Sequence, residues 1–100
     1  MILRGILLGL ASALLASCAN QNPGPLAGTW MATEPFPVTV TFRDGETEAM
    51  GVTRAASYEV HGNEVLVTYA EGSNKGTTFK YQVINPNTIR SDSATFRRVH

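Results

Sequence analysis

The chain of 100 residues contains a single cysteine, Cys18, and only two histidines. One cysteine excludes an internal disulfide and any zinc site built from several thiolates. Eight basic and eight acidic residues give a formal net charge of zero. This balance gives no indication of nucleic-acid binding, which normally requires a basic patch or stripe. Its length allows one small domain at most.

The chain also lacks the patterns on which catalysis or metal binding would depend. A nucleophilic triad needs a His beside a Ser or Cys, but His61 lies at a predicted turn and His100 is the last residue. Glu46 and Glu48 share one strand face and are expected to be solvated. The loop EGSNKG, residues 71–76, lacks phosphate-loop spacing. We therefore expect a protein that is not an enzyme and uses no metal or cofactor.

The most hydrophobic stretch lies at the start of the chain. Arg4 is followed by the apolar run GILLGLASALLA. A run of about a dozen residues is too short to cross roughly 30 Å of hydrocarbon as a helix. A positive residue, a short apolar run and small residues are together typical of a secretory signal. We interpret residues 1–17 in this way.

The residues that end this stretch, Leu15-Ala16-Ser17-Cys18, resemble the lipobox of bacterial lipoproteins: a Leu, two small residues and a Cys. The resemblance implies cleavage before Cys18 and attachment of acyl chains such as palmitate, which would anchor the protein to a membrane. Ala19 follows where Asp would favour retention at the inner membrane, so the outer membrane is expected, with the domain facing the periplasm. The alternative is an ordinary secretory signal in which Cys18 is incidental.

Residues 18–25 contain the polar segment ANQNPGP and are expected to form a flexible tether. Residues 26–100 show no convincing helical pattern; their apolar residues alternate with period two, which predicts strands. In the weakest strand, Met50 and Val52 are expected to point inward. The predicted strands lie in PVTVTFR, AASYEV, EVLVTYA, TTFKYQV and ATFRRV, with inward faces that include Val38, Val40, Phe42, Tyr58, Val65, Val67, Phe79, Tyr81 and Phe96.

Turn signals join these strands as hairpins. Asp44-Gly45 and Gly62-Asn63 suggest two-residue type I′ turns. The pattern predicts an all-β fold, an antiparallel up-and-down meander of seven to eight strands, closed or nearly closed into a small barrel. Closure is favoured because an open sheet leaves exposed edges. The interior is expected to be filled by the barrel's own aromatic and valine side chains.

The segment PLAGTW, residues 25–30, resembles the entry motif of the lipocalin-like (calycin) barrels. The resemblance implies that Trp30 lies on the first strand and that an Arg of the last strand covers its indole. Of Arg97 and Arg98, strict alternation places Arg98 on the inward face with Phe96. Such a contact contributes roughly 0.5 to 2 kcal/mol. Lipocalins are about twice as long, which argues against a roomy ligand cavity.

Three functions stay open. The first is a structural or assembly role in which the lipid-anchored domain binds an envelope protein partner. The second is binding of a small apolar ligand between the aromatic residues, although these are expected to form the core. The third is inhibition of a periplasmic protease or lysozyme through the loop 71–76.

Overall fold

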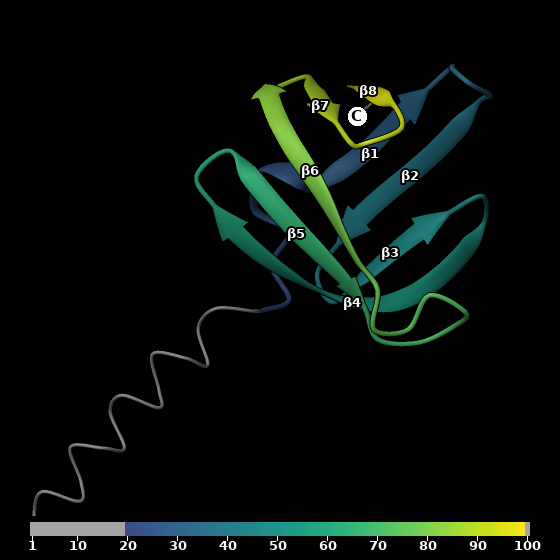
Figure 1. Ribbon diagram of the computed structural model, residues 1–100, viewed down its shortest axis with the longest axis vertical. Coiled ribbons are helices and arrows are strands. Elements are labelled where there is room, and N and C mark those ends of the chain that lie inside the picture. Colours follow the sequence, from purple (N-terminus) through teal and green to yellow (C-terminus); the bar gives the residue numbers. More distant parts are fainter. Residues whose placement is uncertain (1–19, 100) are drawn as a thin grey trace, which may run out of the picture.

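The computed structural model describes residues 20–99, so Cys18 and the expected signal lie outside the described residues. The described chain is a closed antiparallel barrel in which each strand pairs with the next and β8 returns to β1 (Figure 1). This confirms the predicted lipocalin-like meander. Its elements are the 3-10 helix η1 (Gly24–Leu26) and the strands β1 (Gly28–Ala32), β2 (Val38–Arg43), β3 (Glu46–Ala49), β4 (Val52–His61), β5 (Glu64–Tyr69), β6 (Thr78–Asn85), β7 (Thr88–Arg90) and β8 (Thr95–Arg98).

The barrel has two different ends, because the strands alternate in direction. One end holds η1 and the turns after β2, β4 and β6, and we call it the closed end. The other, the open end, holds the connections after the odd-numbered strands. In Figure 1 the loop after β1 and the turn after β3 lie on the right and the turn after β4 on the left. The open-end connections are residues 33–37, 50–51, 70–77 and 91–94.

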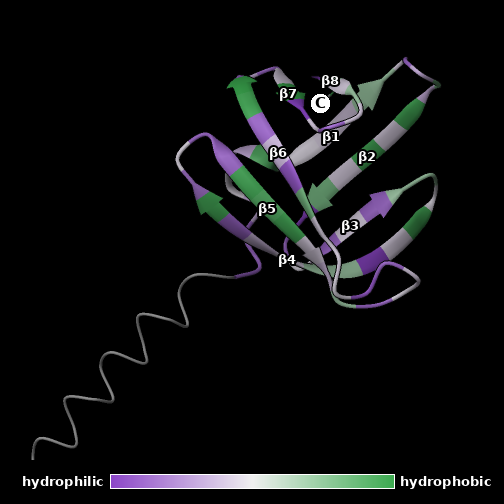
Figure 2. Ribbon diagram, in the orientation of Figure 1, coloured by the Kyte–Doolittle hydropathy of each residue, from purple (hydrophilic) through white to green (hydrophobic). Residues whose placement is uncertain are grey.

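The core consists of alternate side chains from the strands. Figure 2 shows the resulting alternation of hydrophobic and hydrophilic residues along the ribbons. Phe42 packs edge-to-face on Tyr58 and on Tyr81, with ring centroids 6.2 and 5.2 Å apart. Such pairs add about 0.5–1.5 kcal/mol each beyond the burial of their area. The buried core residues are Leu26, Trp30, Ala32, Val40, Phe42, Ala56, Tyr58, Val65, Val67, Ile89 and Phe96.

The prediction that Met50 points inward is wrong, since this residue lies in the β3–β4 turn and its side chain is 67% exposed. Val52 lies opposite Ala49 and on the face of β4 that carries Ala56 and Tyr58, so it does point inward, although its side chain at the rim of the barrel is 47% exposed. Met50 and Gly51 form the β3–β4 turn, and both have positive φ, 55° and 82°. A turn of this kind is the type I′ pattern. Because β3 therefore ends one residue before Met50, the inward positions of that strand belong to Thr47, which is buried, and Ala49.

The two predicted hairpin turns occupy their expected places, but neither is type I′. Only the glycine of each pair, Gly45 and Gly62, has positive φ, while Asp44 and Asn63 do not. A type I′ turn requires positive φ at both central residues. The glycines thus predicted the positions of the turns correctly, but the predicted turn type is wrong.

Residues 20–26, which we call the N-terminal strap, differ from the expected flexible tether. Asn20 exchanges two backbone hydrogen bonds with Tyr58, of 2.8 and 2.7 Å, and the Gln21 carbonyl accepts one from Gly45. Pro23 and Leu26 are buried. The reason is that β4 continues beyond Ala55, its last residue that pairs with β3, so its second half needs another hydrogen-bonding neighbour.

Two phenols, the buried Tyr58 and the partly buried Tyr81, make the domain sensitive to alkaline pH. Burial, and secondarily the nearby Tyr69, raises the pKa of both Tyr58 and Tyr81 above the ordinary value. The unfolded chain then releases these protons near pH 10 while the folded chain keeps them, so stability is complete below about pH 10 and falls as pH rises above it.

We expect the free energy of unfolding in urea to decline as the pH rises above about 10, with a slope of up to about 1.4 kcal/mol per pH unit for each such phenol. Tyr81→Phe removes one of these protons and should flatten the decline. A variant whose stability falls as steeply as that of the parent would contradict this assignment.

Candidate functional site

Trp30 and Arg98 lie together at the point where the barrel closes. Trp30 is fully buried, and its indole Nε1 donates a hydrogen bond of 2.9 Å to the Leu26 carbonyl of η1. Arg98 is its direct partner across the β1–β8 pair. The Arg98 guanidinium carbon lies 4.2 Å from the centroid of the Trp30 ring, a cation–π contact. Arg97 is exposed on the outer face instead.

The Arg98 guanidinium also binds three backbone carbonyls. It donates hydrogen bonds to Pro86 (2.9 Å), Ala27 (2.8 Å) and Pro25 (3.4 Å). Pro86 lies in the β6–β7 turn, Pro25 lies within η1, and Ala27 directly follows η1. One side chain therefore joins the first strand, the last strand, the strap and a turn. Its Nε, Nη1 and Nη2 atoms each donate one hydrogen bond and its face covers the indole, which indicates a structural role.

The β1–β8 pair separates toward the open end. Only Trp30↔Arg98 and Met31↔Arg97 are in register, with one further hydrogen bond from Val99 to Thr29. Because antiparallel strands use alternate residues for hydrogen bonds, the next bonded pair would be Thr33 with Thr95. The register contains no such pair. The backbone N–H and C=O of Thr95 thus point toward β1 but form no hydrogen bond with that strand.

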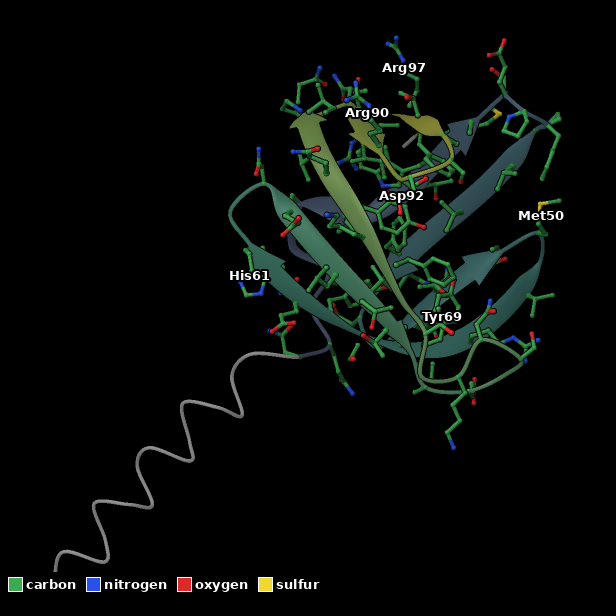
Figure 3. All side chains as sticks on the ribbon, in the orientation of Figure 1. Met50, His61, Tyr69, Arg90, Asp92 and Arg97 are labelled. Carbon is green, nitrogen blue, oxygen red and sulfur yellow. The ribbon has the colours of Figure 1, made fainter. Side chains whose placement is uncertain are left out.

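A groove of about 810 Å³ lies at this opening. We call it the seam groove. Its walls are the end of β1 with residues 33–35 on one side and residues 90–95 on the other. Met31 and Val99, 41% and 47% exposed, contribute apolar surface. The charged lining includes Arg90, Asp92 and Arg97, which Figure 3 labels on the β7–β8 hairpin.

The other residues singled out in the sequence lie apart from this groove. Arg43 forms ion pairs with Glu46 and Glu48 at 3.0 and 2.7 Å, and these hydrogen bonds, Glu48 first, raise the pKa of Arg43. His61 is exposed, with Nε2 3.4 Å from the Glu59 carboxylate. His100 lies outside the described residues.

Within residues 20–99, no group of three His, Cys, Asp or Glu side chains is placed to hold a metal ion. The same part of the chain contains no helix long and apolar enough to cross a membrane.

The seam groove was not found from the sequence. The available signal was Met31, an apolar residue that alternation places outward beside the inward Trp30. An outward apolar residue is common on strands, so it marks no site by itself. The groove arises because β7 and β8, with three and four residues, are too short to follow β1 and β6 to the open end.

The same shortness explains Phe79. This ring faces Tyr69 with centroids 5.5 Å apart, yet it is 37% exposed. Pairing of β6 with β7 begins only at Gln82, so the start of β6 has no neighbour on that side. Phe79 therefore points inward as predicted, but it stays partly exposed because no neighbouring strand covers it.

Comparisons of the chain with protein-family models, with curated proteins and with solved structures found no match. The candidate site therefore depends on the geometry alone.

Arg98→Gln should destabilise the domain by about 2–3 kcal/mol, because it removes charge-assisted hydrogen bonds and the contact with the indole. The measurement is urea unfolding followed by tryptophan fluorescence, which also reports the surroundings of Trp30. Arg97→Gln is the matched control and should change stability by less than about 0.5 kcal/mol. Equal losses in the two variants would mean that Arg98 has no special part in closure.

Proposed function

We propose that the protein is a lipid-anchored lipoprotein of the bacterial outer membrane. Its barrel would face the periplasm and bind an envelope protein partner in a structural or assembly role, without enzymatic activity. The anchor rests on the lipobox-like Leu15-Ala16-Ser17-Cys18, which lies outside the described residues. The docking role rests on one observation, the seam groove beside the unpaired backbone of Thr95.

The seam groove has the anatomy of a protein interface. Apolar side chains of Met31 and Val99 lie among charged ones, and protein interfaces similarly combine an apolar centre with a polar rim. Phe36, 60% exposed, extends the apolar surface next to Pro35. An extended segment of the partner could pair with Thr95 by strand addition. An acidic side chain of that segment would suit Arg97.

The packing of the barrel favours docking over transport of an apolar ligand. Trp30, Phe42 and Tyr58 fill the interior and are essentially inaccessible. A carrier would need that volume for its ligand.

Inhibition of a periplasmic hydrolase is a second candidate, favoured by the loop between β5 and β6. Residues 71–76 are all exposed, and internal hydrogen bonds such as Lys75 N–H to the Gly72 carbonyl hold the loop in shape. A loop ordered in this way loses little conformational freedom on entering a cleft.

Site-specific cross-linking separates these roles. A photoreactive amino acid replaces Met31, Ile84 or Asn74, one at a time, in the full-length protein in the membranes of the producing cell. Ile84 is the matched control: it is an exposed apolar residue, 45% accessible, outside the seam groove. We expect one discrete protein adduct from position 31 and none from position 84, and Met31→Glu should lose that partner.

An adduct from position 74 alone would favour the inhibitor, and adducts from neither 31 nor 74 would contradict docking. A small added mass that survives desalting, seen in the native mass of the detergent-extracted protein, would favour the apolar-ligand carrier.

The anchor has its own test. Cys18→Ala removes the thiol that would accept the lipid, so an uncleaved and unlipidated precursor should accumulate. Mass spectrometry of the intact protein measures this. Normal cleavage and membrane retention of Cys18→Ala would show that the lipobox resemblance is misleading, whereas the docking experiment could still succeed.

A further inference from the structure

A second hollow lies at the open end, inside the rim of the barrel. Its volume is about 180 Å³, and none of the residues that line it belongs to the seam groove. Four of its polar side chains matter here: Thr47 of β3, Arg54 of β4, Tyr69 of β5 and Glu71 of the following loop. Figure 3 labels Tyr69 above this loop. We call this hollow the mouth pocket.

Thr47 contributes a buried hydroxyl that lacks a partner. The residue is 1% exposed, and its Oγ1 forms no hydrogen bond with any part of the described chain. A buried polar group left in this state costs about 1–3 kcal/mol. Valine would have the same shape without that cost. Thr47 lines the mouth pocket, so a group bound there could supply the missing partner.

Arg54 supplies a positive charge next to the loop that follows β5. Its guanidinium lies so close to Gly72 that a Cβ on that glycine would meet Cζ, Nε and Nη1 at 2.8 Å. Gly72 also has φ +85°, a conformation that residues with a side chain rarely adopt. Unlike Arg43 and Arg98, Arg54 has no ion pair or side-chain hydrogen bond within residues 20–99.

Glu71 places a negative charge in the same pocket. Its Oε2 accepts a hydrogen bond of 2.8 Å from the backbone N–H of Ala55, which fixes the carboxylate and leaves Oε1 available. A pocket lined by one cation and one anion suits a ligand with both charges. A guanidinium binds a carboxylate well, because its parallel N–H donors match the two oxygens.

We propose that the mouth pocket binds a small zwitterion of amino-acid size. The ligand's carboxylate binds Arg54, its ammonium group binds Glu71, and the hydroxyls of Thr47 and Tyr69 form hydrogen bonds with its polar atoms. The volume is below the roughly 300–1,000 Å³ of pockets for drug-sized ligands, which limits the ligand to a few heavy atoms. Water could satisfy the Thr47 hydroxyl but would bring no charge to Arg54.

The test is a titration of the full-length, ¹⁵N-labelled protein in mild detergent, followed by NMR. Alanine is the probe, and propionate and ethylamine each retain only one of its two charges. We expect millimolar alanine to shift the backbone amides of Ala55 and of residues 71–74 and to leave those of residues 97–98 unchanged. Propionate should bind more weakly, and ethylamine should not bind measurably.

Variants assign the contacts. Arg54→Gln should weaken alanine binding at least about tenfold, and Thr47→Val should weaken it severalfold while the dispersed spectrum of the folded barrel is kept. Glu71→Gln should remove the preference for alanine over propionate. Arg97→Gln, a change of the same kind outside the mouth pocket, should bind alanine as the parent does.

Three results would overturn the proposal: no site-specific shift with alanine, unchanged binding by Arg54→Gln, or tighter binding of inorganic phosphate than of alanine. The docking proposal is independent of all three, because the seam groove shares no residue with the mouth pocket.

Discussion

The structure depends on how the last strand returns to the first. The β1–β8 pair has only two residue pairs in register, the fewest of the eight strand pairs. The contact of Arg98 with Trp30 compensates for this short ladder, because the guanidinium also binds carbonyls of η1, of the residue that follows it and of the β6–β7 turn. Loss of the contact would free the strap, the turn and β8 together. Closure is therefore a property of one end of the barrel.

This asymmetry places the candidate sites. At the closed end, the N-terminal strap and η1 cover the core and satisfy the second half of β4. Toward the open end, the short strands β7 and β8 do not reach as far as their neighbours. On either side of the loop 91–94, β8 therefore separates from β1 and β7 separates from β6. The separation of β8 from β1 forms the seam groove, and the separation of β7 from β6 exposes Phe79. The strand lengths, more than any single side chain, decide where the molecule can bind something.

Alternation and turn residues predicted the barrel well. Val40, Phe42, Val65 and Val67 are inward because period-two patterning is decided locally, and the choice of Arg98 over Arg97 used the same rule. The pattern failed at Met50, since methionine is not a turn former and only Gly51 marked the hairpin. It could not find the sites either. Arg54 lies next to Gly72 because the loop between β5 and β6 folds back toward β4, and a local sequence pattern does not predict such a contact.

The open end also bears a cost that the closed end does not. A domain of this size has a stability of about 5–15 kcal/mol, and a buried hydroxyl without a partner removes about 1–3 kcal/mol of it. Thr47 stands where valine would pack as well, and the charge of Arg54 lies beside it in the same pocket. A group that lowers stability inside a pocket is typical of binding sites, because a ligand can supply the missing partner.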